Sequence, residues 1–404
     1  MSCALASTSQ HTTTHFSQLE ILDGRRAADD NRDGMTRIGF AYNQKPEPTV
    51  GLVSAATEPR SDEEPPSIDD VYAEWDSAET IDAVAAALAA CGDVIRLEAD
   101  DSFPERLRAE RPDIVFNIAE GLRGPNREAH VPAICEFFGV PYSGSDPFTL
   151  SLCLHKARTK DFLTSYGIPN APYALVAAGA ELDRVLAGDS PLPMPSHDAP
   201  LFLKPVQEGS SKGITEKNLV RDRDELAMQA RLLLETYDQP VLIETFLPGA
   251  EFTCGVLGNG TDARVLPLVG MNFASLPQGA LPIYGFEAKW IWDTRDEPLD
   301  IFQCPARVDR RLQAAIEDVV LRAYRALGCR DWSRVDVRLD ARGVPNVVEV
   351  NPLPGILPDP EDNSCLPKAA RAAGLSYDEL IQSALLAAAA RCGVALSTVR
   401  AEVA

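Results

Sequence analysis

Apolar positions between residues 36 and 145 form short runs that are separated by longer amphipathic segments. The short runs predict three buried strands, at 37–42, 93–98 and 113–121. The segment 75–92, between the first two runs, has the spacing of a helix. The order strand, helix, strand, helix, strand is typical of a parallel α/β domain, so we expect one over this part of the chain.

The helix predicted over 75–92 carries signals at both of its ends. Asp76 is a good N-cap residue, and Glu79 three residues later completes a capping box. Gly92 supplies the stop, because glycine readily ends a helix. We therefore expect the helix to begin directly after Asp76.

The remaining pattern predicts two further domains, over 146–247 and 248–404. Its patterned segments are a helix over 151–168, a strand and return strand joined by a Gly/Ser turn over 201–214, two paired strand-like runs over 241–258, and helices over 309–328 and 377–391. The last helix follows Ser376, and Glu379 completes another capping box.

Two stretches have the composition of connections rather than of packed structure. Residues 1–34 are polar and lack the apolar segment of a secretory signal, so we expect a disordered tail over 1–35. Residues 58–70 are acidic and rich in proline, which is typical of a disordered or functional loop. The first domain is therefore expected to span 36–145.

Two alternating segments within 333–351 predict a β-hairpin with a four-residue loop. We expect Asp340 to pair with Pro345, because a one-residue slip would bury the charged positions and expose the valines. Proline is acceptable there as the first residue of a strand. Val348 and Val350 are expected to point into the core.

This register sets Asp336 directly opposite Glu349, and Arg334 opposite Asn351. Two facing carboxylates repel each other, so a positive group must compensate them. Arg334 and Arg338 are one possible source, and a divalent cation is the other. Asp, Glu and Asn offer only oxygen ligands, which suits Mg²⁺ or Mn²⁺ rather than Zn²⁺. Mg²⁺ takes its remaining ligands from water and phosphates, so the metal interpretation, which we favour, predicts a phosphate ligand.

The segment 204–213 is the candidate partner of that phosphate. Its small residues let backbone N–H groups converge on an anion, at Gly209, Ser210, Ser211 and Gly213. Lys204 and Lys212 add positive charge, and Lys156 is either a further phosphate ligand or a solvated helix residue. The pattern GxxxxGK[ST] of a Walker A loop is absent, and a plain hairpin tip is the alternative.

The stretch 243–252 has a shape suited to a nucleobase. The strand end from Glu244 to Leu247 offers backbone groups and a carboxylate to an adenine edge, and Glu251 lies a turn away, near the ribose. The alternative is an edge strand followed by a turn.

Composition narrows the class of protein. The chain has 404 residues and 45% hydrophobic content, enough for two or three packed domains. Its net charge of −22 makes nucleic acid and anionic membranes poor partners. Nine cysteines form no CxxC pair, so we expect reduced thiols and a cytoplasmic protein. No apolar run approaches the roughly 20 residues of a membrane span.

Six motifs occur in an order that resembles the ATP-grasp superfamily, and within it the D-alanine–D-alanine ligases. They are HKARTK (155–160), KPVQEGSSKGI (204–214), IETFLPGAEFT (243–253), EAKW (287–290), SRVDV (333–337) and EVNPLPG (349–355). The similarity covers nearly all of 110–390. It implies a three-domain ATP-grasp fold of the α+β and α/β type, in which a central and a C-terminal domain clamp ATP behind an N-terminal parallel α/β domain.

The resemblance implies a nucleotide site between the second and third domains. Its phosphate-binding residues would be Lys156, Lys204, Glu208, Gly209, Ser210 and Ser211. Adenine would meet Glu244 and the Leu247 backbone, and the ribose would meet Glu251. Two Mg²⁺ or Mn²⁺ ions are implied at Asp336, Glu349 and Asn351.

Catalytic and substrate roles also follow from the resemblance. Arg334 would stabilise a developing oxyanion, Lys289 would close over the γ-phosphate, and Ser210 would lie near the first substrate. The segment with Ser364 and Cys365 matches the one that holds the second substrate's carboxylate. The implied reaction phosphorylates a carboxylate to an acyl phosphate, which an amine then attacks. A homodimer is also suggested.

The substrate half departs from the family pattern. The glycine-rich turn after the first strand is missing, and Glu74 is a loosely aligned counterpart of the glutamate that holds the first substrate's amine. Glu120 stands where the family has histidine, Trp290 replaces a closing-loop tyrosine, and residues 359–362 form an acidic insert. We therefore hypothesise substrates other than two D-alanines, or one substrate with a positive group.

The leading prediction is an ATP-dependent carboxylate–amine ligase that acts on small amino acids or amines. Three alternatives stay open: the same chemistry on other substrates in a biosynthetic pathway, a non-catalytic nucleotide-binding protein, and a kinase that releases an acyl phosphate.

Overall fold

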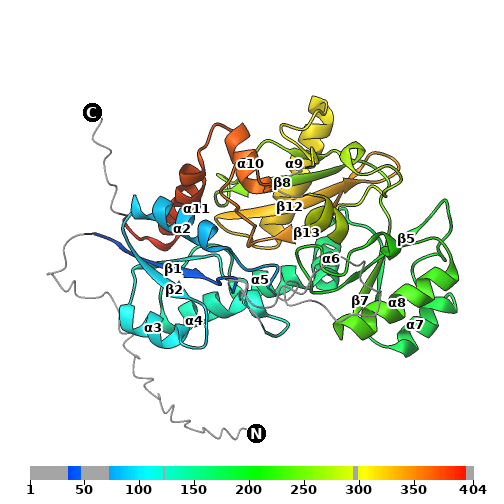
Figure 1. Ribbon diagram of the computed structural model, residues 1–404, viewed down its shortest axis with the longest axis horizontal. Coiled ribbons are helices and arrows are strands. Elements are labelled where there is room, and N and C mark those ends of the chain that lie inside the picture. The colour runs from blue at the N-terminus through cyan, green and yellow to red at the C-terminus, as the bar shows by residue number, and fades with distance from the viewer. Residues whose placement is uncertain (1–34, 47–71, 122, 294–298, 397–404) are drawn as a thin grey trace, which may run out of the picture. The chain divides into compact units, whose positions relative to one another are not determined.

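The computed structural model describes residues 35–46, 72–121, 123–293 and 299–396. The predicted tail, apart from Met35, and the acidic loop over 58–70 lie outside these residues. Three sheets organise the described chain, and Figure 1 labels some of the strands of each. Within it, no helix combines the length and the apolar character that a membrane crossing requires.

The first sheet is parallel and has the strand order β2-β1-β3. Its strands are β1 (Arg37–Tyr42), β2 (Asp93–Glu98) and β3 (Ile114–Asn117). The helices of this part are α2 (Ala78–Ala89), α3 (Phe103–Glu110) and α4 (His130–Phe138), the last preceded by a 3₁₀ turn, η1 (Arg127–Ala129). The parallel α/β arrangement predicted for this part of the chain is confirmed.

The ends of α2 differ from the prediction. Ser77, not Asp76, is the N-cap, and its hydroxyl accepts a hydrogen bond from the backbone N–H of Thr80 at 3.2 Å. Asp76 instead bridges the backbone of Gln44 next to the first sheet. The helix ends at Ala89, before Gly92, where a Cβ would overlap the carbonyl oxygen of Thr36. Gly92 is thus needed for close packing against the first strand.

The second sheet is antiparallel and has the order β4-β7-β5-β6. Its strands are β4 (Tyr173–Val176), β5 (Leu201–Pro205), β6 (Leu219–Val220) and β7 (Val241–Thr245). Helices α7 (Gly179–Leu186) and α8 (Arg223–Tyr237) bury apolar side chains with this sheet, and a 3₁₀ turn, η2 (Glu216–Asn218), precedes β6. The expected return strand directly after the Gly/Ser turn is wrong, because β5 pairs with β6 further along the chain.

The single helix predicted over 151–168 is in fact two helices, α5 (Pro147–Leu154) and α6 (Lys156–Ser165). His155 between them has an extended backbone, and its Nδ1 accepts a hydrogen bond from the N–H of Arg158 at 3.3 Å. A side chain that caps a new helix competes with continuation of the old one. The break makes Lys156 the first residue of α6.

The third sheet has the order β11-β10-β8-β12-β13, with β9 paired to β8. Its strands are β8 (Glu251–Leu257), β9 (Arg264–Val265), β10 (Val269–Met271), β11 (Phe302–Gln303), β12 (Trp332–Leu339) and β13 (Pro345–Asn351). The other elements here are α9 (Arg310–Ala326), α10 (Cys365–Ala372), α11 (Tyr377–Cys392), a 3₁₀ turn η3 (Phe273–Ser275) and a π-helical turn η4 (Ala288–Trp292). The runs within 241–258 do not pair as expected, since β7 belongs to the second sheet and β8 to the third.

The hairpin formed by β12 and β13 has the predicted register at the end that lies away from the turn. Arg334 pairs with Asn351, and Asp336 pairs with Glu349. A bulge then shifts the register by one residue, so that Leu339, not Asp340, pairs with Pro345. The carboxylate of Asp340 is instead used in the turn, where it accepts hydrogen bonds from the N–H groups of residues 342 and 344 at 2.8 and 2.9 Å.

The bulge decides which valines are buried. Val347 and Val350 are buried in the core, as the alternation of β13 requires on either side of the bulge. The expectation that Val348 points into the core is wrong, because Val348 is half-buried and lines a cavity beside Glu349. The polar face of the hairpin and Val348 therefore line the same cavity.

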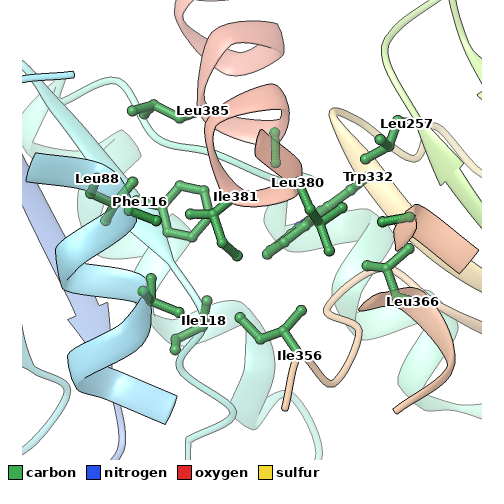
Figure 2. Packing of buried hydrophobic residues seen from close by; sticks show 14 of the residues in the cluster. Leu88, Phe116, Ile118, Leu257, Trp332, Ile356, Leu366, Leu380, Ile381 and Leu385 are labelled. Atoms are coloured by element: carbon green, nitrogen blue, oxygen red, sulfur yellow. The ribbon is translucent and has the colours of Figure 1, made fainter. Parts of the chain in front are cut away.

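Helix α11, close to the C-terminus, packs against α2 of the first sheet (Figure 1). Figure 2 shows Ile381 and Leu385 of α11 beside Leu88 and Phe116, with Trp332 on the other side of Leu380. The rings of Phe116 and Trp332 meet edge to face, 5.4 Å between centroids. This shared core ties the first and third sheets together through apolar burial.

Replacing Ile381 with alanine tests the contribution of this core to stability. Ile381 is fully buried, so Ile381→Ala should lower the free energy of unfolding by about 2–5 kcal/mol through lost burial and the cavity left behind. Leu386→Ala on the same helix is the control, because Leu386 is 50% exposed. Urea unfolding monitored by circular dichroism gives both values, and equal losses would contradict this account.

Candidate active site

One cavity of about 430 Å³ is lined by residues of the second and third sheets and by loops that lie next to the first sheet. It brings together every predicted site residue whose side chain the structure describes, although these residues are widely spaced in the sequence. They are Glu74, Glu120, Lys156, Lys204, Glu208, Gly209, Ser210, Ser211, Glu244, Leu247, Glu251, Lys289, Arg334, Asp336, Glu349, Asn351, Ser364 and Cys365. Trp290 belongs to η4, and its side chain lies outside the described residues.

The carboxylates of the hairpin are neutralised from two directions. Arg334 Nη2 lies 3.1 Å from Asp336 Oδ2, and Lys156 Nζ, from the start of α6, lies 2.7 Å from Glu349 Oε1. Burial alone would raise the pKa of Glu349, but Lys156 brings this pKa below its usual value. Arg338 does not share in this compensation, because it pairs with Glu251 at 2.7 Å.

The same face of the hairpin offers a set of oxygen donors that fits a hard divalent cation. Thr253 Oγ1 donates to Asp336 Oδ1 at 2.9 Å, and Asn351 Nδ2 lies 3.4 Å from Asp336 Oδ2, with Glu349 directly across. No three His, Cys, Asp or Glu side chains form a metal cluster in the described chain. Mg²⁺ commonly uses only one or two protein carboxylates, so two carboxylates and an amide are sufficient.

A second ionic cluster occupies the wall formed by the second sheet. Glu244 on β7 forms two ion pairs. Its Oε1 lies 2.7 Å from Lys204 Nζ, and its Oε2 lies 2.7 Å from Lys160 Nζ. Burial would raise the pKa of Glu244, but the two lysines lower this pKa to about 2. Lys160 was not singled out from the sequence, although its spacing of four from Lys156 places both on one face of α6.

The Arg338 guanidinium and the Phe246 ring lie in the neighbouring wall of the cavity, and the Phe273 ring packs against Arg338. Arg338 lies 4.6 Å from the ring centroid of Phe246 and 5.3 Å from that of Phe273, and it donates to the Pro282 carbonyl at 2.9 Å. Phe246 and Leu247 follow Glu244 along the cavity, and Glu251 is held by Arg338. This end of the cavity thus combines the apolar side chains of Phe246 and Leu247 with the ion pair of Arg338 and Glu251.

The Gly/Ser turn after β5 has an unusual backbone. Ser210 and Ser211 both adopt left-handed conformations, with φ of 51° and 61°. Such conformations are unfavourable for residues with a side chain and persist only where the surroundings hold them. Ser211 Oγ donates to the Tyr284 carbonyl at 3.2 Å, and Lys156 Nζ donates to the Glu208 carbonyl at 2.6 Å. The alternative of a plain hairpin tip does not explain these contacts.

Lys289 and the start of α10 complete the rim on the side of the third sheet. Burial, and then the nearby Arg334, lower the pKa of Lys289 to about 8. The hydroxyl of Ser364 accepts a hydrogen bond from the N–H of Leu357 at 3.1 Å. Cys365 is the first residue of α10, and burial raises the pKa of its thiol to about 11, so the thiol stays protonated at neutral pH.

Three residues that line the cavity near the first sheet were missed by sequence reasoning, Lys45, Asp76 and Glu128, and so was Arg127, which contacts the lining residue Glu74. Burial raises the pKa of Asp76 and of Glu128 to about 7, and burial followed by Glu128 raises that of Glu120 well above its usual value. The run "NREAH" that contains Arg127 and Glu128 carries no periodic signal that would mark a site.

Comparisons with known proteins agree with this geometry. The model of the family "D-ala D-ala ligase C-terminus" matches residues 162–386. A D-alanine–D-alanine ligase of Cupriavidus taiwanensis is 33% identical over 276 residues, which cover 68% of this chain and 76% of that protein. An uncharacterised protein, y4sG, of Sinorhizobium fredii is 32% identical over 320 residues, covering 77% and 88%.

The crystal structure of a Bacillus anthracis D-alanine–D-alanine ligase complexed with ATP superimposes with a TM-score of 0.60 and 22% identity, covering 89% of this chain and 99% of that one. The fold is therefore that of the ATP-grasp enzymes, as predicted. The chain belongs to the D-alanine–D-alanine ligase family and is an ATP-dependent ligase that forms C–N bonds. The predicted family, fold class and enzyme class are confirmed.

Removing the Glu244 carboxylate should destabilise the protein in a pH-dependent way. Glu244→Gln leaves Lys160 and Lys204 buried without their counter-charge, which should lower the free energy of unfolding at pH 7 by about 3–5 kcal/mol. The pKa of Glu244 is depressed in the folded state, from 4.5 to about 2. Its contribution is therefore present above pH 4.5 and is lost as the pH falls toward 2.

Urea unfolding of wild type and variant at pH 7, 5, 4 and 3 measures this difference. The matched control is Asp82→Asn, which removes an exposed pair with Arg96 and should change stability by less than about 1 kcal/mol. A difference between wild type and Glu244→Gln that stays constant from pH 5 to pH 3 would show that Glu244 is not a buried, ionised partner of the lysines.

Proposed function

We propose that this ligase joins the carboxylate of one small amino acid to the amine of a second small molecule, through an acyl phosphate, in the cavity described above. The observation that carries the proposal is the convergence of two different surfaces on one space. Lysines and a left-handed turn suited to phosphates come from the second sheet, and oxygen donors suited to Mg²⁺ come from the hairpin.

The proposed nucleotide site follows the walls of the cavity. The apolar wall at Phe246 and Leu247, with Glu244 beside it, is suited to adenine, and Glu251 is suited to the ribose hydroxyls. The phosphates would meet Lys156, Lys204 and the turn of Glu208, Gly209, Ser210 and Ser211. Converging N–H groups and lysines favour anions electrostatically.

Asp336, Glu349 and Asn351 would hold one or two Mg²⁺ or Mn²⁺ ions beside these phosphates. The fit is supported by the donor set, which contains only oxygen ligands, and by the position of Asp336 directly across from Glu349. A divalent cation there would neutralise phosphate charge as it develops. Lys156 and Arg334, which contact these carboxylates in the structure, would then be available to phosphate and substrate oxygens.

The chemistry would proceed in two displacements. ATP supplies the phosphoryl group that converts the carboxylate into an acyl phosphate. The amine nitrogen then attacks the acyl carbon, and phosphate leaves with one former carboxylate oxygen. Arg334 is proposed to stabilise the charge on the remaining oxygen, since its Nε is buried and has no hydrogen-bond partner among the described residues. Lys289 would cover the transferring phosphoryl group and Ser210 would contact the first substrate.

The substrates would occupy the end of the cavity lined by Glu74, Glu120, Ser364 and Cys365, with Trp290 on the adjoining turn. Burial raises the pKa of Glu120 and of Glu128 more than the nearby Arg127 lowers it. Carboxyl groups that are only partly compensated at the wall of a cavity favour a ligand with positive charge. This supports a substrate that carries an ammonium group. It is also compatible with an acid substrate and an amine substrate other than two D-alanines.

The cellular location and the oligomeric state are proposed from the charge and from the family. The acidic surface charge and the family suggest a cytoplasmic enzyme that works on small molecules, and the family suggests a homodimer. The alternative of a kinase that stops at the acyl phosphate is separated by one reagent, since hydroxylamine would trap its product without any amine substrate.

The experiment that tests the function is ADP release by the full-length protein with Mg²⁺ and ATP. D-Alanine, L-amino acids, β-amino acids and diamines would be supplied singly and in pairs, with products identified by mass. We expect release that depends on an acid and an amine together and yields their condensation product. Absence of ADP release with every pair, in protein that binds ATP, would favour the non-catalytic alternative.

Within that assay, Asp336→Asn should lower the rate of ADP release by about 10²-fold or more. The variant lacks a carboxylate ligand of the proposed divalent cation, and that cation neutralises the phosphate charge. Asp340→Asn is the matched control, since Asp340 directly follows β12 and its carboxylate caps the hairpin turn outside the cavity. An Asp336→Asn enzyme as active as the control would contradict the proposed metal site.

A further inference from the structure

The Gly/Ser turn that faces the proposed phosphate site is fastened to the opposite side of the cavity by an ionic cluster of Glu74, Arg127 and Lys212, here called the Glu74 clamp. Arg127 Nη2 lies 3.0 Å from both carboxylate oxygens of Glu74. The two side chains are only 10% exposed each. Because Nη2 alone meets both oxygens, Nη1 can serve a second acceptor, and a charge-assisted contact in a buried place restricts the geometry of both partners.

The other arm of Arg127 reaches the turn itself. Arg127 Nη1 donates to the carbonyl oxygen of Gln207 at 3.1 Å, and Gln207 Nε2 donates back to the Pro125 carbonyl at 2.9 Å. One side chain therefore contacts the segment that carries Glu74 and the residue at which the turn begins. Because these bonds link residues 53 and 80 positions apart in sequence, they exist only when the domains' segments are assembled.

Lys212 closes the cluster at the far end of the turn. Its Nζ lies 2.7 Å from Glu208 and 3.3 Å from Glu74, so a single lysine spans the turn and meets the clamp. Glu74 also lies directly against Gly209, where a Cβ would overlap its Oε1 atom. Residues 208 to 213 are thus held at their first residue, at Gly209 and near their end.

The backbone conformation of the turn explains why such a hold is needed. Ser210 and Ser211 are both left-handed, an arrangement that an unrestrained turn would leave. Consecutive backbone N–H groups can face an anion only while this conformation lasts. Burial would raise the pKa of Glu74, but Arg127 and then Lys212 lower it, so the carboxylate stays charged and the clamp stays intact at neutral pH.

We propose that Arg127 is a positioning residue for the reaction: acting through Glu74 and Gln207, it holds the Gly/Ser turn in the conformation that receives the nucleotide phosphates. This rests on the proposed ATP site. Glu74 lines the cavity with Glu120, so the clamp also makes the order of the phosphate turn depend on the segment next to the first substrate. Arg127 itself need touch neither nucleotide nor substrate.

The test compares Arg127→Met, Arg127→Lys, Glu74→Gln and the double variant Arg127→Met/Glu74→Gln in the full-length protein. The control is Arg96→Met, which removes an arginine–carboxylate pair of the first sheet whose side chains are 47% and 66% exposed. Hydrogen exchange of the amides of residues 209–213 without nucleotide, the KM for Mg·ATP, kcat and the unfolding midpoint are measured for each variant.

We expect the turn amides of Arg127→Met to exchange about tenfold faster, and the KM for Mg·ATP to rise about tenfold, which corresponds to roughly 1.4 kcal/mol. Arg127→Lys should recover part of the loss, and Arg96→Met should show no change in exchange or KM. The double variant should lose less than the sum of the two single variants, because both changes break the Arg127–Glu74 contact.

Unchanged turn exchange and unchanged KM in Arg127→Met would overturn the proposal, as would additive effects in the double variant. If Arg127→Met does not fold, Arg127→Lys gives the deciding values, because it keeps the charge but has one nitrogen in place of the two that meet Glu74 and Gln207. Exchange is measured without nucleotide, so it judges the clamp independently of activity. A wild-type protein that binds no ATP would instead overturn the proposed function, and with it the role assigned to the clamp.

Discussion

Two carboxylates, Asp336 and Glu349, are set directly opposite each other on neighbouring strands, and the organisation of the cavity follows from the need to neutralise them. Arg334 does so from the same hairpin, but Lys156 comes from a helix that precedes the second sheet. Glu349 therefore keeps its counter-charge only while α6 is docked against the hairpin. The interaction that joins the two sheets is also the one that builds the site.

The same principle recurs around the cavity. Glu244 is matched by two lysines, Glu251 by Arg338, and Glu74 by Arg127 and Lys212. A bound nucleotide with Mg²⁺ would bring both missing kinds of charge, phosphate for the lysines and a cation for the hairpin acids. The ion pairs seen between Lys156 and Glu349 and between Arg334 and Asp336 can then exchange partners without leaving a buried charge alone.

Much of this arrangement follows from local sequence pattern. Alternation in 333–351 was enough to predict that Asp336 faces Glu349, because any other register would bury charge. The bulge that exposes Val348 to the cavity was not predictable, since a period of two carries no sign of an inserted residue. The break at His155 was missed for a similar reason: a cap is used only if the chain beyond it packs elsewhere, which is a tertiary fact.

Residues that act through long-range ion pairs were the hardest to predict from the sequence. Arg127 and Lys160 lie far in sequence from Glu74 and Glu244, and their roles depend on partners that only the folded chain brings near. The assignment of β7 and β8 to different sheets was not predictable for the same reason. These strands are adjacent in sequence, but β7 pairs with β4 and β8 pairs with β12. Motif order identified the family, and packing decided which charges meet.

The central claim is that the cavity binds a nucleotide together with a divalent cation held by the hairpin. Titration calorimetry of the full-length protein with a non-hydrolysable ATP analogue, in Mg²⁺ and in EDTA, tests it most directly. The account predicts binding that weakens by about tenfold or more without the metal, and a loss of this metal dependence in Asp336→Asn. Equal affinity with and without Mg²⁺ in the wild-type protein, or no binding at all, would contradict it.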